Sequence, residues 1–237
     1  MTSCQQLSNG MDHPTIEYTK LSHDRLDEAL DLMVSCFFTR EPTFSVLSGL
    51  AGGTPEDHRL WLSASLPEWH WDASWLALDV GTGCVIGASM CGVYGVDERD
   101  PYWRLYETGS EAARVYGSFM DEVGHSFDAF KSLNVPTVSE NLLLAVDPRY
   151  GGLGVGSELC HRTSVEGAVR SGAPVSLCFC TSSTTQRIYE RLGFEVGCET
   201  DYAGSALERA VDVTPILPHR ACRVMYKRLG RASTSSS

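Results

Sequence analysis

The chain has 237 residues, a formal net charge of −11, and apolar and charged fractions of 43% and 21%, which are ordinary for a globular protein. This length can bury a large core in one domain or at most two. A chain this acidic is a poor candidate for binding nucleic acid, which needs clustered lysine and arginine, whereas a cationic small substrate is compatible with it.

We expect a flexible segment over residues 1–14, a single domain over 15–230 and a disordered polar tail over 231–237. The first fourteen residues lack the apolar core of a signal peptide. The longest uncharged stretch, CVIGASMCGVYGV, is too short and too rich in glycine for a membrane span. These features predict a cytoplasmic protein with no membrane or nucleic-acid partner.

Nine cysteines are spread along the chain without a CxxC pair, which favours reduced and mostly buried thiols. Cys178 and Cys180 stand at strand spacing and are badly placed for a zinc knuckle. His70, His125 and His161 show no ligand spacing. We therefore expect no metal site.

Hydrophobic periodicity and helix-capping residues predict alternating strands and helices. Ser22 can cap a first helix, Pro42 should end it after Glu41, and Thr54 can begin the next one. In chain order we expect a strand at 15–20, a helix at 26–38, a helix beginning at 54–57, strands at 75–80 and 84–94, a helix at 110–133, a strand at 141–146, a helix at 156–171, a strand at 174–180, a helix at 183–192, and strands at 194–202 and 219–229. This mixture predicts one mixed α/β domain.

Four glycines lie between a predicted strand and a predicted helix, in the stretch VDPRYGGLGVGSEL (146–159). Such backbone freedom is costly unless the chain turns sharply or a ligand approaches closely, so the stretch suggests an anion held by backbone N–H groups. A P-loop is excluded because Ser157-Glu158 replaces its lysine, and a dinucleotide fingerprint lacks the acid after the next strand. The pattern [RQ]xxGx[GA] is met in full by residues 149–154, although a merely tight turn would also satisfy it.

One strand later comes TSSTTQRIYERLGFE (181–195), a hydroxyl-rich turn followed by a helix. At this point the chain resembles the GCN5-related N-acetyltransferases (GNAT). The resemblance implies a mixed, mostly antiparallel twisted sheet flanked by helices, and a glycine loop whose amides receive the pyrophosphate of acetyl-CoA. It also implies that Tyr189 serves as general acid, whereas a packing role is the alternative for an aromatic residue on such a helix.

The resemblance is closest to the insect-type arylalkylamine (dopamine) N-acetyltransferases and extends over roughly residues 15–229. Four segments carry it: CFFTREPTFSVLSGL, LLLAVDPRYGGLGVGSEL, CTSSTTQRIYERLGF and PHRACRVMYKRL. It implies that Glu41 is the catalytic glutamate and that Thr181 and Thr185 replace two catalytic serines. It further implies contacts of acetyl-CoA with ten residues: Leu144, Ala145, Val146, Arg149, Gly151, Gly152, Gly154, Val155, Gly156 and Ser157. Among these, the main-chain N–H of Val146 is the expected oxyanion donor.

The sequence departs from the subfamily at three places. Arg40 stands where an acid usually precedes the glutamate, and a guanidinium beside Glu41 would stabilise its carboxylate and weaken it as a base. Gly151 replaces a usual basic residue, so one phosphate contact is absent. Thr181 and Thr185 keep a hydroxyl, but β-branching restricts its placement, and helix capping is the alternative role for both.

These observations together predict an acetyl-CoA-dependent amine N-acetyltransferase whose acceptors are arylalkylamines such as dopamine, tyramine, octopamine or serotonin. Acetylation of aliphatic di- or polyamines is the alternative activity, and a non-catalytic acyl-CoA-binding module is the alternative class. For Glu41 the competing interpretation is a solvated acid at a helix end. Four tryptophans are candidates to line an aromatic amine pocket, although packing is their commoner role: Trp61, Trp69, Trp71 and Trp75.

Overall fold

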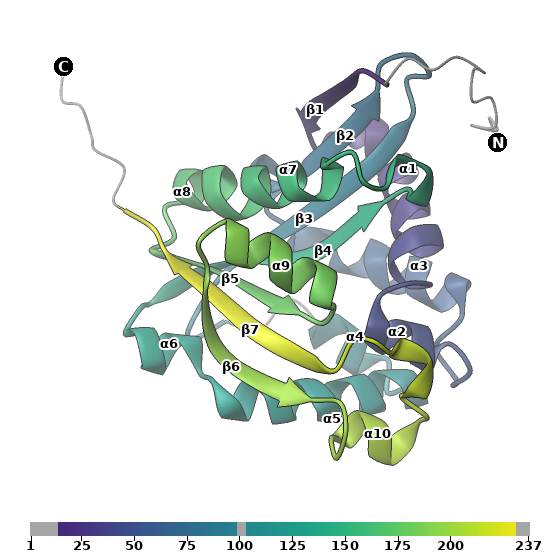
Figure 1. Ribbon diagram of the computed structural model, residues 1–237, viewed down its shortest axis with the longest axis vertical. Coiled ribbons are helices and arrows are strands. Elements are labelled where there is room, and N and C mark those ends of the chain that lie inside the picture. The colour runs from purple at the N-terminus through teal and green to yellow at the C-terminus, as the bar shows by residue number, and fades with distance from the viewer. Residues whose placement is uncertain (1–13, 99–102, 231–237) are drawn as a thin grey trace.

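The computed structural model describes residues 14–98 and 103–230, and in this part of the chain seven strands form one sheet (Figure 1). Their spatial order is β1-β2-β3-β4-β5-β7-β6, and every neighbouring pair is antiparallel except β4 and β5. The strands are β1 (Ile16–Lys20), β2 (Trp75–Asp79), β3 (Val85–Gly95), β4 (Thr137–Val146), β5 (Val175–Cys180), β6 (Glu195–Asp201) and β7 (Ala221–Arg228). The predicted mixed, mostly antiparallel sheet is confirmed.

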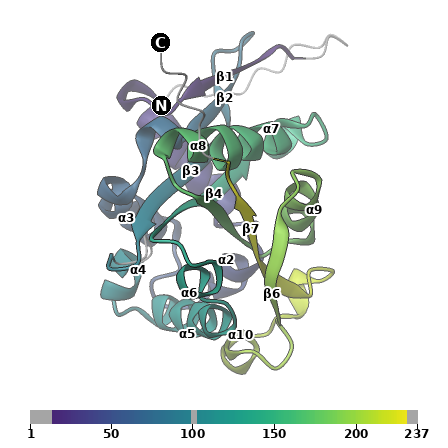
Figure 2. The ribbon, with the colours of Figure 1, turned by 90° about the vertical axis from the view of Figure 1, so that its left-hand side faces the viewer.

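Helices cover both faces of this sheet (Figures 1 and 2). One face carries α7 (Val155–His161), which continues through a π-helical segment (Arg162–Gly167) into α8 (Ala168–Ser171), and also α9 (Ser183–Arg191). The remaining helices are α1 (Leu26–Leu32) with its π-helical extension (Met33–Phe37), α2 (Pro42–Leu47), α3 (Pro55–Ser65), α4 (Trp103–Glu107), α5 (Glu111–Ser126), α6 (Ala129–Leu133) and α10 (Ala206–Ala210). No helix within the described residues is both long and apolar enough to cross a membrane.

The parallel strands β4 and β5 separate soon after they meet. They pair only at Ser139–Ser176 and Glu140–Leu177, so the rest of β4 has no partner on this side. On its other side β4 pairs with β3 along its whole length, with a register shift that leaves Leu142 as a β-bulge. The separation opens a gap in the middle of the sheet, and the functional site described below lies in this gap.

The hydrophobic core explains which predicted elements formed. The largest cluster joins α1, α3 and α5 to one face of the sheet and includes Met33, Leu62 and Phe119, each completely buried. A second cluster places Val155 and Leu159 of α7 against β2 and β3. Gly87 of β3 permits this close packing, because a Cβ atom on it would lie 2.8 Å from the side chain of Leu159, which would then have to shift.

Helix ends show where local sequence rules succeed and where they fail. Thr54 caps the start of α3, as predicted, and forms a complete capping box with Asp57. Ser22 precedes a 3₁₀ turn and its side chain makes no capping hydrogen bond, so that prediction is wrong. The helix predicted at 110–133 breaks at Phe127, whose backbone is extended, and Asp128 caps a new helix, α6.

Seven of the described cysteines are free, and five of them are buried. Cys84 is the exception, because it is disulfide-bonded. The prediction of reduced thiols is therefore wrong for Cys84. Cys178 and Cys180 lie with Cys160 in the cluster around Tyr189, where burial raises the pKa of the Cys160 and Cys180 thiols and keeps them protonated.

Candidate active site

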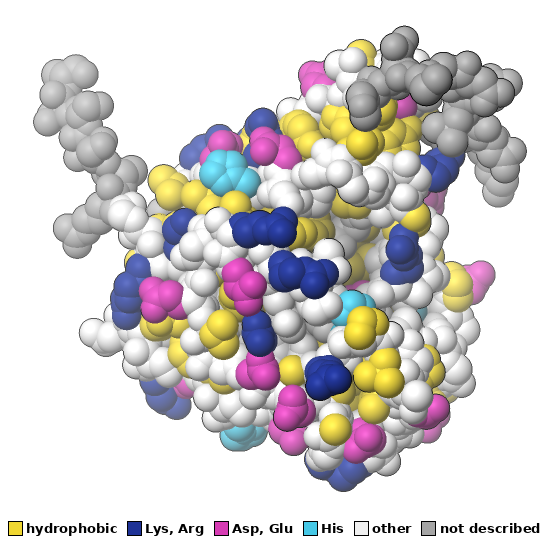
Figure 3. All heavy atoms as spheres, viewed as in Figure 1, with side chains coloured by type: hydrophobic (Ala, Val, Ile, Leu, Met, Phe, Trp, Pro, Cys, Tyr) yellow, Lys and Arg dark blue, Asp and Glu magenta, His cyan; other side chains and the backbone are white. Residues whose placement is uncertain are grey.

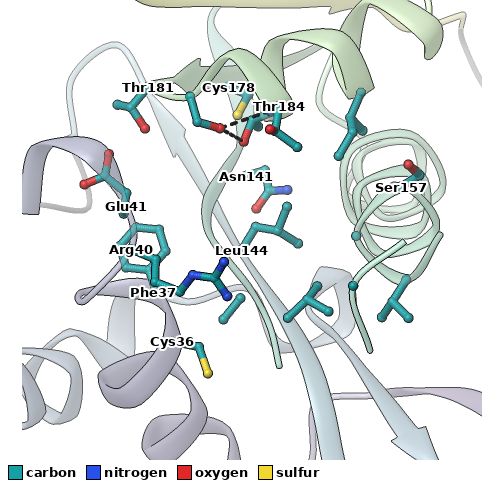
Figure 4. Close-up of a pocket in the computed structure, with 18 of the residues that line it drawn as sticks. Cys36, Phe37, Arg40, Glu41, Asn141, Leu144, Ser157, Cys178, Thr181 and Thr184 are labelled. Carbon is teal, nitrogen blue, oxygen red and sulfur yellow. Dashed lines mark hydrogen bonds between the residues drawn. The ribbon is translucent and has the colours of Figure 1, made fainter. Parts of the chain in front are cut away.

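A cavity of about 680 Å³ occupies the gap between β4 and β5 (Figure 4). Three structural units wall it: the end of the first helix with the start of α2, the unpaired edge of β4 with the glycine loop, and the start of α9. It collects thirteen of the fourteen residues predicted for the site: Glu41, Leu144, Ala145, Val146, Gly151, Gly152, Gly154, Val155, Gly156, Ser157, Thr181, Thr185 and Tyr189. Segments more than 140 positions apart in the sequence therefore meet in one cavity.

Glu41 is held at this cavity by its own backbone neighbours. Its carboxylate oxygen Oε2 accepts a hydrogen bond from the backbone N–H of Phe44 at 2.7 Å and another from the hydroxyl of Thr43 at 2.6 Å. Glu41 is thereby the N-cap of α2, with Pro42 at the first helical position. Its other oxygen, Oε1, is buried and has no hydrogen-bond partner among the described residues. A buried acceptor without a partner is costly, so Oε1 is suited to receive a hydrogen bond from a ligand.

Arg40 also lines the cavity, next to Glu41 in the chain. Within the described residues its guanidinium forms no ion pair, and in particular none with Glu41. Figure 4 shows this guanidinium reaching from the wall of Glu41 toward Leu144. The sequence led us to expect that a guanidinium beside Glu41 would weaken it as a base. In this structure the Arg40 guanidinium makes no direct contact with the Glu41 carboxylate that could have this effect.

The unpaired edge of β4 presents main-chain N–H groups to the gap. The N–H of Asp147 donates to the carbonyl of Ile86 on β3 at 2.8 Å. Successive N–H groups of a strand alternate in direction, so the N–H of Val146 points the other way, into the gap. Val146 lies beyond the last β4–β5 pair and lines the cavity. Its N–H is therefore available to a ligand oxygen.

The glycine loop turns between β4 and α7 with two residues in the left-handed region. Gly152 has φ 79° and Gly154 has φ 81°, conformations that only glycine adopts at low cost. A Cβ atom built on either glycine meets no atom within 4 Å, so both face open space. Gly154 is the N-cap of α7 and supplies no side-chain capping hydrogen bond. The first N–H groups of this helix therefore have no side-chain cap among the described residues and can bind an anion.

Arg149 is the one predicted site residue that does not line the cavity. Its backbone N–H donates to the Asp147 carboxylate at 2.9 Å, and its guanidinium forms an ion pair with the same carboxylate. The hydrogen bond from Arg149 lowers the pKa of Asp147 and so keeps it ionised. Arg187 and Arg191 of α9 do line the cavity, and Figure 3 shows basic side chains gathered over this helix.

Tyr189 borders the cavity, and its side chain is completely buried. Its hydroxyl accepts a hydrogen bond from Nδ2 of Asn141 at 2.7 Å and lies 2.7 Å from Oγ of Ser164. Burial raises the pKa of Tyr189 well above its usual value, so the phenol is protonated at neutral pH. The side chain thus combines a packed ring with a proton held in a hydrogen-bond network.

The two threonines differ in their surroundings. The hydroxyl of Thr185 lies 2.8 Å from that of Ser182, and Ser182, not either threonine, caps α9. Thr181 lies at the same end of the cavity as Glu41 (Figure 4). Its carbonyl accepts a hydrogen bond from the hydroxyl of Tyr202 at 2.6 Å, which fixes the turn.

Sequence reasoning missed several residues of this site. Asn141 lines the cavity and orients Tyr189, but a lone asparagine in a strand carries no sequence signal. His219 accepts a hydrogen bond at Nδ1 from the backbone N–H of Ser183, at 3.2 Å. Burial lowers the pKa of His219, and Glu41 is near enough to raise it in part. This contact joins positions 36 apart in the chain, so neither segment alone predicts it.

The aromatic residues of the cavity are not the predicted tryptophans. None of Trp61, Trp69, Trp71 and Trp75 lines it; three are buried in the two larger core clusters and Trp71 packs against the first. The aromatic wall near Glu41 instead consists of Phe37, Phe44 and Tyr116. Phe44 stacks on Tyr116 with ring centroids 4.6 Å apart. No cluster of three or more potential metal ligands occurs in the described ranges.

Comparisons with known proteins agree with this architecture. Residues 100–196 match the model of the acetyltransferase (GNAT) domain. The crystal structure of arylalkylamine N-acetyltransferase 2 from Aedes aegypti superposes with a TM-score of 0.74 at 23% identity, over 91% of this chain and 99% of that one. Polyamine N-acetyltransferase from Drosophila melanogaster, which catalyses the formation of N-acetylagmatine, gives 0.73 at 18%, over 91% and 100%.

A bacterial structure extends the comparison to the cosubstrate. The putative acetyltransferase yncA from Salmonella typhimurium, solved with its cofactor acetyl-CoA, gives a TM-score of 0.51 at 15% identity, over 94% of this chain and 99% of that one. The GNAT fold and the resemblance to insect arylalkylamine N-acetyltransferases, both predicted from the sequence, are confirmed by these matches.

Proposed function

We propose, for a chain that carries an acetyltransferase (GNAT) domain and has the fold of the N-acetyltransferases, that it transfers the acetyl group of acetyl-CoA to the primary amine of a small arylalkylamine. The observation that carries this proposal is the position of Glu41. Its Oε2 is fixed by the start of α2, while its buried Oε1 has no hydrogen-bond partner in the part of the chain that the structure describes. Such a carboxylate oxygen is suited to bind an ammonium group and to remove its proton.

The glycine loop and α9 are the elements that would hold acetyl-CoA. GNAT domains use this cosubstrate, and it supplies an activated acetyl thioester. Its phosphates fit the free N–H groups at the start of α7 beside the open space over Gly152 and Gly154. The guanidinium groups of Arg187 and Arg191 add positive charge to this wall, in a protein whose net charge is −11. These two arginines compensate for the basic side chain that is absent at Gly151.

The chain's own groups then perform the proton transfers. An alkylammonium has a pKa of about 10, so its lone pair is occupied at neutral pH and a base must free it. Glu41 is the proposed base, directly or through one water molecule. The N–H of Val146 is the proposed donor to the carbonyl oxygen of the thioester. Tyr189 is the proposed proton source for the departing thiolate, and Thr181 and Thr185 assist proton movement at the other end of the site.

The aromatic wall favours arylalkylamines over aliphatic polyamines. Phe37, Phe44 and Tyr116 lie around Glu41 and offer a surface for a ring. A polyamine needs a second anion for its second ammonium group. Glu41 and Asp147 are the two carboxylates that line the cavity in the described residues, and Asp147 is already paired with Arg149.

A thiol-release assay with a panel of amines tests the proposal. We expect aromatic ethylamines to have a higher kcat/KM than putrescine, spermidine or lysine. Ring burial worth about 2 kcal/mol corresponds to roughly thirtyfold discrimination. If a diamine or polyamine has the highest kcat/KM, the preferred acceptors are aliphatic amines and not arylalkylamines. Tight binding of acetyl-CoA without turnover on any amine would leave an acyl-CoA-binding module instead.

A further inference from the structure

Two opposite charges stand next to each other in the chain, face the same cavity and do not neutralise each other. Arg40 and Glu41 both line the cavity. Glu41 is turned away from its neighbour because Oε2 is bound by the N–H of Phe44 and the hydroxyl of Thr43. Arg40 is left without an ion-pair partner in the part of the chain that the structure describes. The part of the cavity near Glu41 therefore carries one positive and one negative side chain that are not paired with each other.

The position of Arg40 separates it from the expected phosphate site. Figure 4 shows Ser157, at the start of α7, on the wall opposite Phe37 and Glu41. The guanidinium of Arg40 extends from the wall that carries Phe37 and Glu41. The phosphate side has its own cations, Arg187 and Arg191, together with the free N–H groups of α7. Arg40 thus extends from the wall that carries the base and the aromatic residues, and its guanidinium reaches from there toward Leu144, across the space where the acceptor is expected to bind.

We infer that Arg40 binds an anionic group of the acceptor, and that the preferred acceptor is an aromatic α-amino acid instead of its decarboxylated amine. This inference rests on the proposed function, because it assigns a substrate class to the same site. Both side chains line the same cavity and their charged ends point in different directions, so a small zwitterion that lies between them can contact both. A planar guanidinium binds a carboxylate through two parallel hydrogen bonds, which also fixes the orientation of the amine.

The reaction is an ordinary acetyl transfer with a carboxylated acceptor. The bond between the amino nitrogen and the acetyl carbon forms, and the thioester C–S bond breaks. The ammonium group loses two protons: one leaves through Glu41 to solvent, and the other ends on the thiol of CoA. No oxidant, reductant or further reactant is needed.

The test compares matched pairs of acceptors in matched variants. The pairs are phenylalanine with phenethylamine, tyrosine with tyramine, and tryptophan with tryptamine, with the methyl esters of the amino acids as uncharged analogues. The proteins are the wild type, Arg40→Gln, Arg40→Glu and the control Arg114→Gln, which removes one exposed arginine from α5 outside the cavity. Ratios between variants cancel the intrinsic difference in basicity among the amines.

We expect the wild type to prefer each amino acid over its amine and over its ester. In Arg40→Gln, kcat/KM for the amino acids should fall about 10- to 100-fold, the range for a lost hydrogen bond to a charged group. The values for amines and esters, and KM for acetyl-CoA, should stay within about threefold. Arg40→Glu should favour the amines further. Arg114→Gln should change neither the ratio of kcat/KM between amino acid and amine nor the ratio between amino acid and ester.

Three results would overturn the inference while leaving the proposed function intact. The first is a wild type that turns over amines but not amino acids. The second is an equal loss for both members of each pair in Arg40→Gln. The third is a rise in KM for acetyl-CoA with unchanged discrimination, which would place Arg40 on the cosubstrate. Turnover of none of these acceptors would overturn the proposed function and this inference together.

Discussion

The Oε2 atom of Glu41 lies 2.7 Å from the backbone nitrogen of Phe44, so the same carboxylate caps α2 and faces the cavity. One oxygen has a structural role. The other, Oε1, has no hydrogen-bond partner among the described residues and can accept one from a ligand. Removing the charge and removing the cap are therefore separable changes at this position.

The variant Glu41→Gln should separate the two roles. Its amide oxygen can still accept from Phe44, so the free energy of unfolding should change by less than about 1 kcal/mol. As the proposed base is lost, kcat/KM should fall by roughly 10²- to 10⁴-fold, with part of the rate recovered at high pH where free amine is abundant. Glu41→Ala should lose the cap as well and cost about 1 kcal/mol more in stability. Retention of more than half of the wild-type kcat/KM by Glu41→Gln would remove Glu41 from the mechanism.

A second prediction concerns the open space over the glycine loop. Gly154→Ala places a methyl group in that space, and calorimetry should show CoA affinity reduced at least tenfold, or about 1.4 kcal/mol. The matched control is Gly172→Ala, because Gly172 has nearly the same backbone, φ 78° against 81°, with equally open surroundings, and does not line the cavity. Both variants should lose about 1–2 kcal/mol of stability from the strained backbone. Equal CoA affinity in the two variants would mean that the loop is only a turn.

The features predicted correctly from the sequence are local ones. The cap formed by Thr54 and the glycine loop each depend on residues within a few positions of one another, so a short pattern determines their geometry. The helix break at Phe127 is different, since its ring stacks on Tyr226 of β7, 99 positions later, with centroids 5.6 Å apart. A contact with a distant strand overrode the continuous periodicity of residues 110–133.

The candidate site shows the same division. Its loop and its glutamate were found from motifs, but the aromatic wall was not, because Phe44 and Tyr116 meet only through the packing of α2 on α5. The tryptophan cluster at 61–75 was the stronger aromatic signal in the sequence, yet those side chains fill the core or pack against it. Hydrophobicity identifies residues that avoid water and does not tell a core from a cavity wall.

The hydroxyl of Tyr189 gives a third prediction. Tyr189→Phe keeps the buried ring and removes the proton, so kcat should fall about 10- to 100-fold while KM for acetyl-CoA stays within about threefold. Because burial raises the pKa of Tyr189, the phenol stays protonated through the neutral and mildly alkaline range. The pH–rate profile of the variant should therefore keep the wild-type shape below pH ~10 and differ in amplitude. Unchanged kcat would assign Tyr189 to packing and to orienting Asn141 alone.

The last prediction concerns the anchor of the glycine loop, where the hydroxyl of Tyr150 donates to Oδ2 of the buried Asp79 at 2.6 Å. Tyr150→Phe leaves that carboxylate short of a donor and should cost about 1–3 kcal/mol at neutral pH, measured by denaturant unfolding. The hydrogen bond from Tyr150 lowers the pKa of Asp79 in the folded state, so its contribution is present above the unfolded value near 3.8 and is lost as the pH falls below it. Burial and Asp79 together raise the pKa of Tyr150 to about 12, so its contribution is present below about pH 10 and is lost as the pH rises toward 12. The variant should therefore lose stability less steeply with pH at both the acidic and the alkaline extreme.

Tyr226→Phe, which removes a comparable but exposed hydrogen bond to Glu195, is the control and should change stability by less than about 0.5 kcal/mol. If the two variants have equal stabilities and equal pH dependence, the contact between Tyr150 and Asp79 does not anchor the loop.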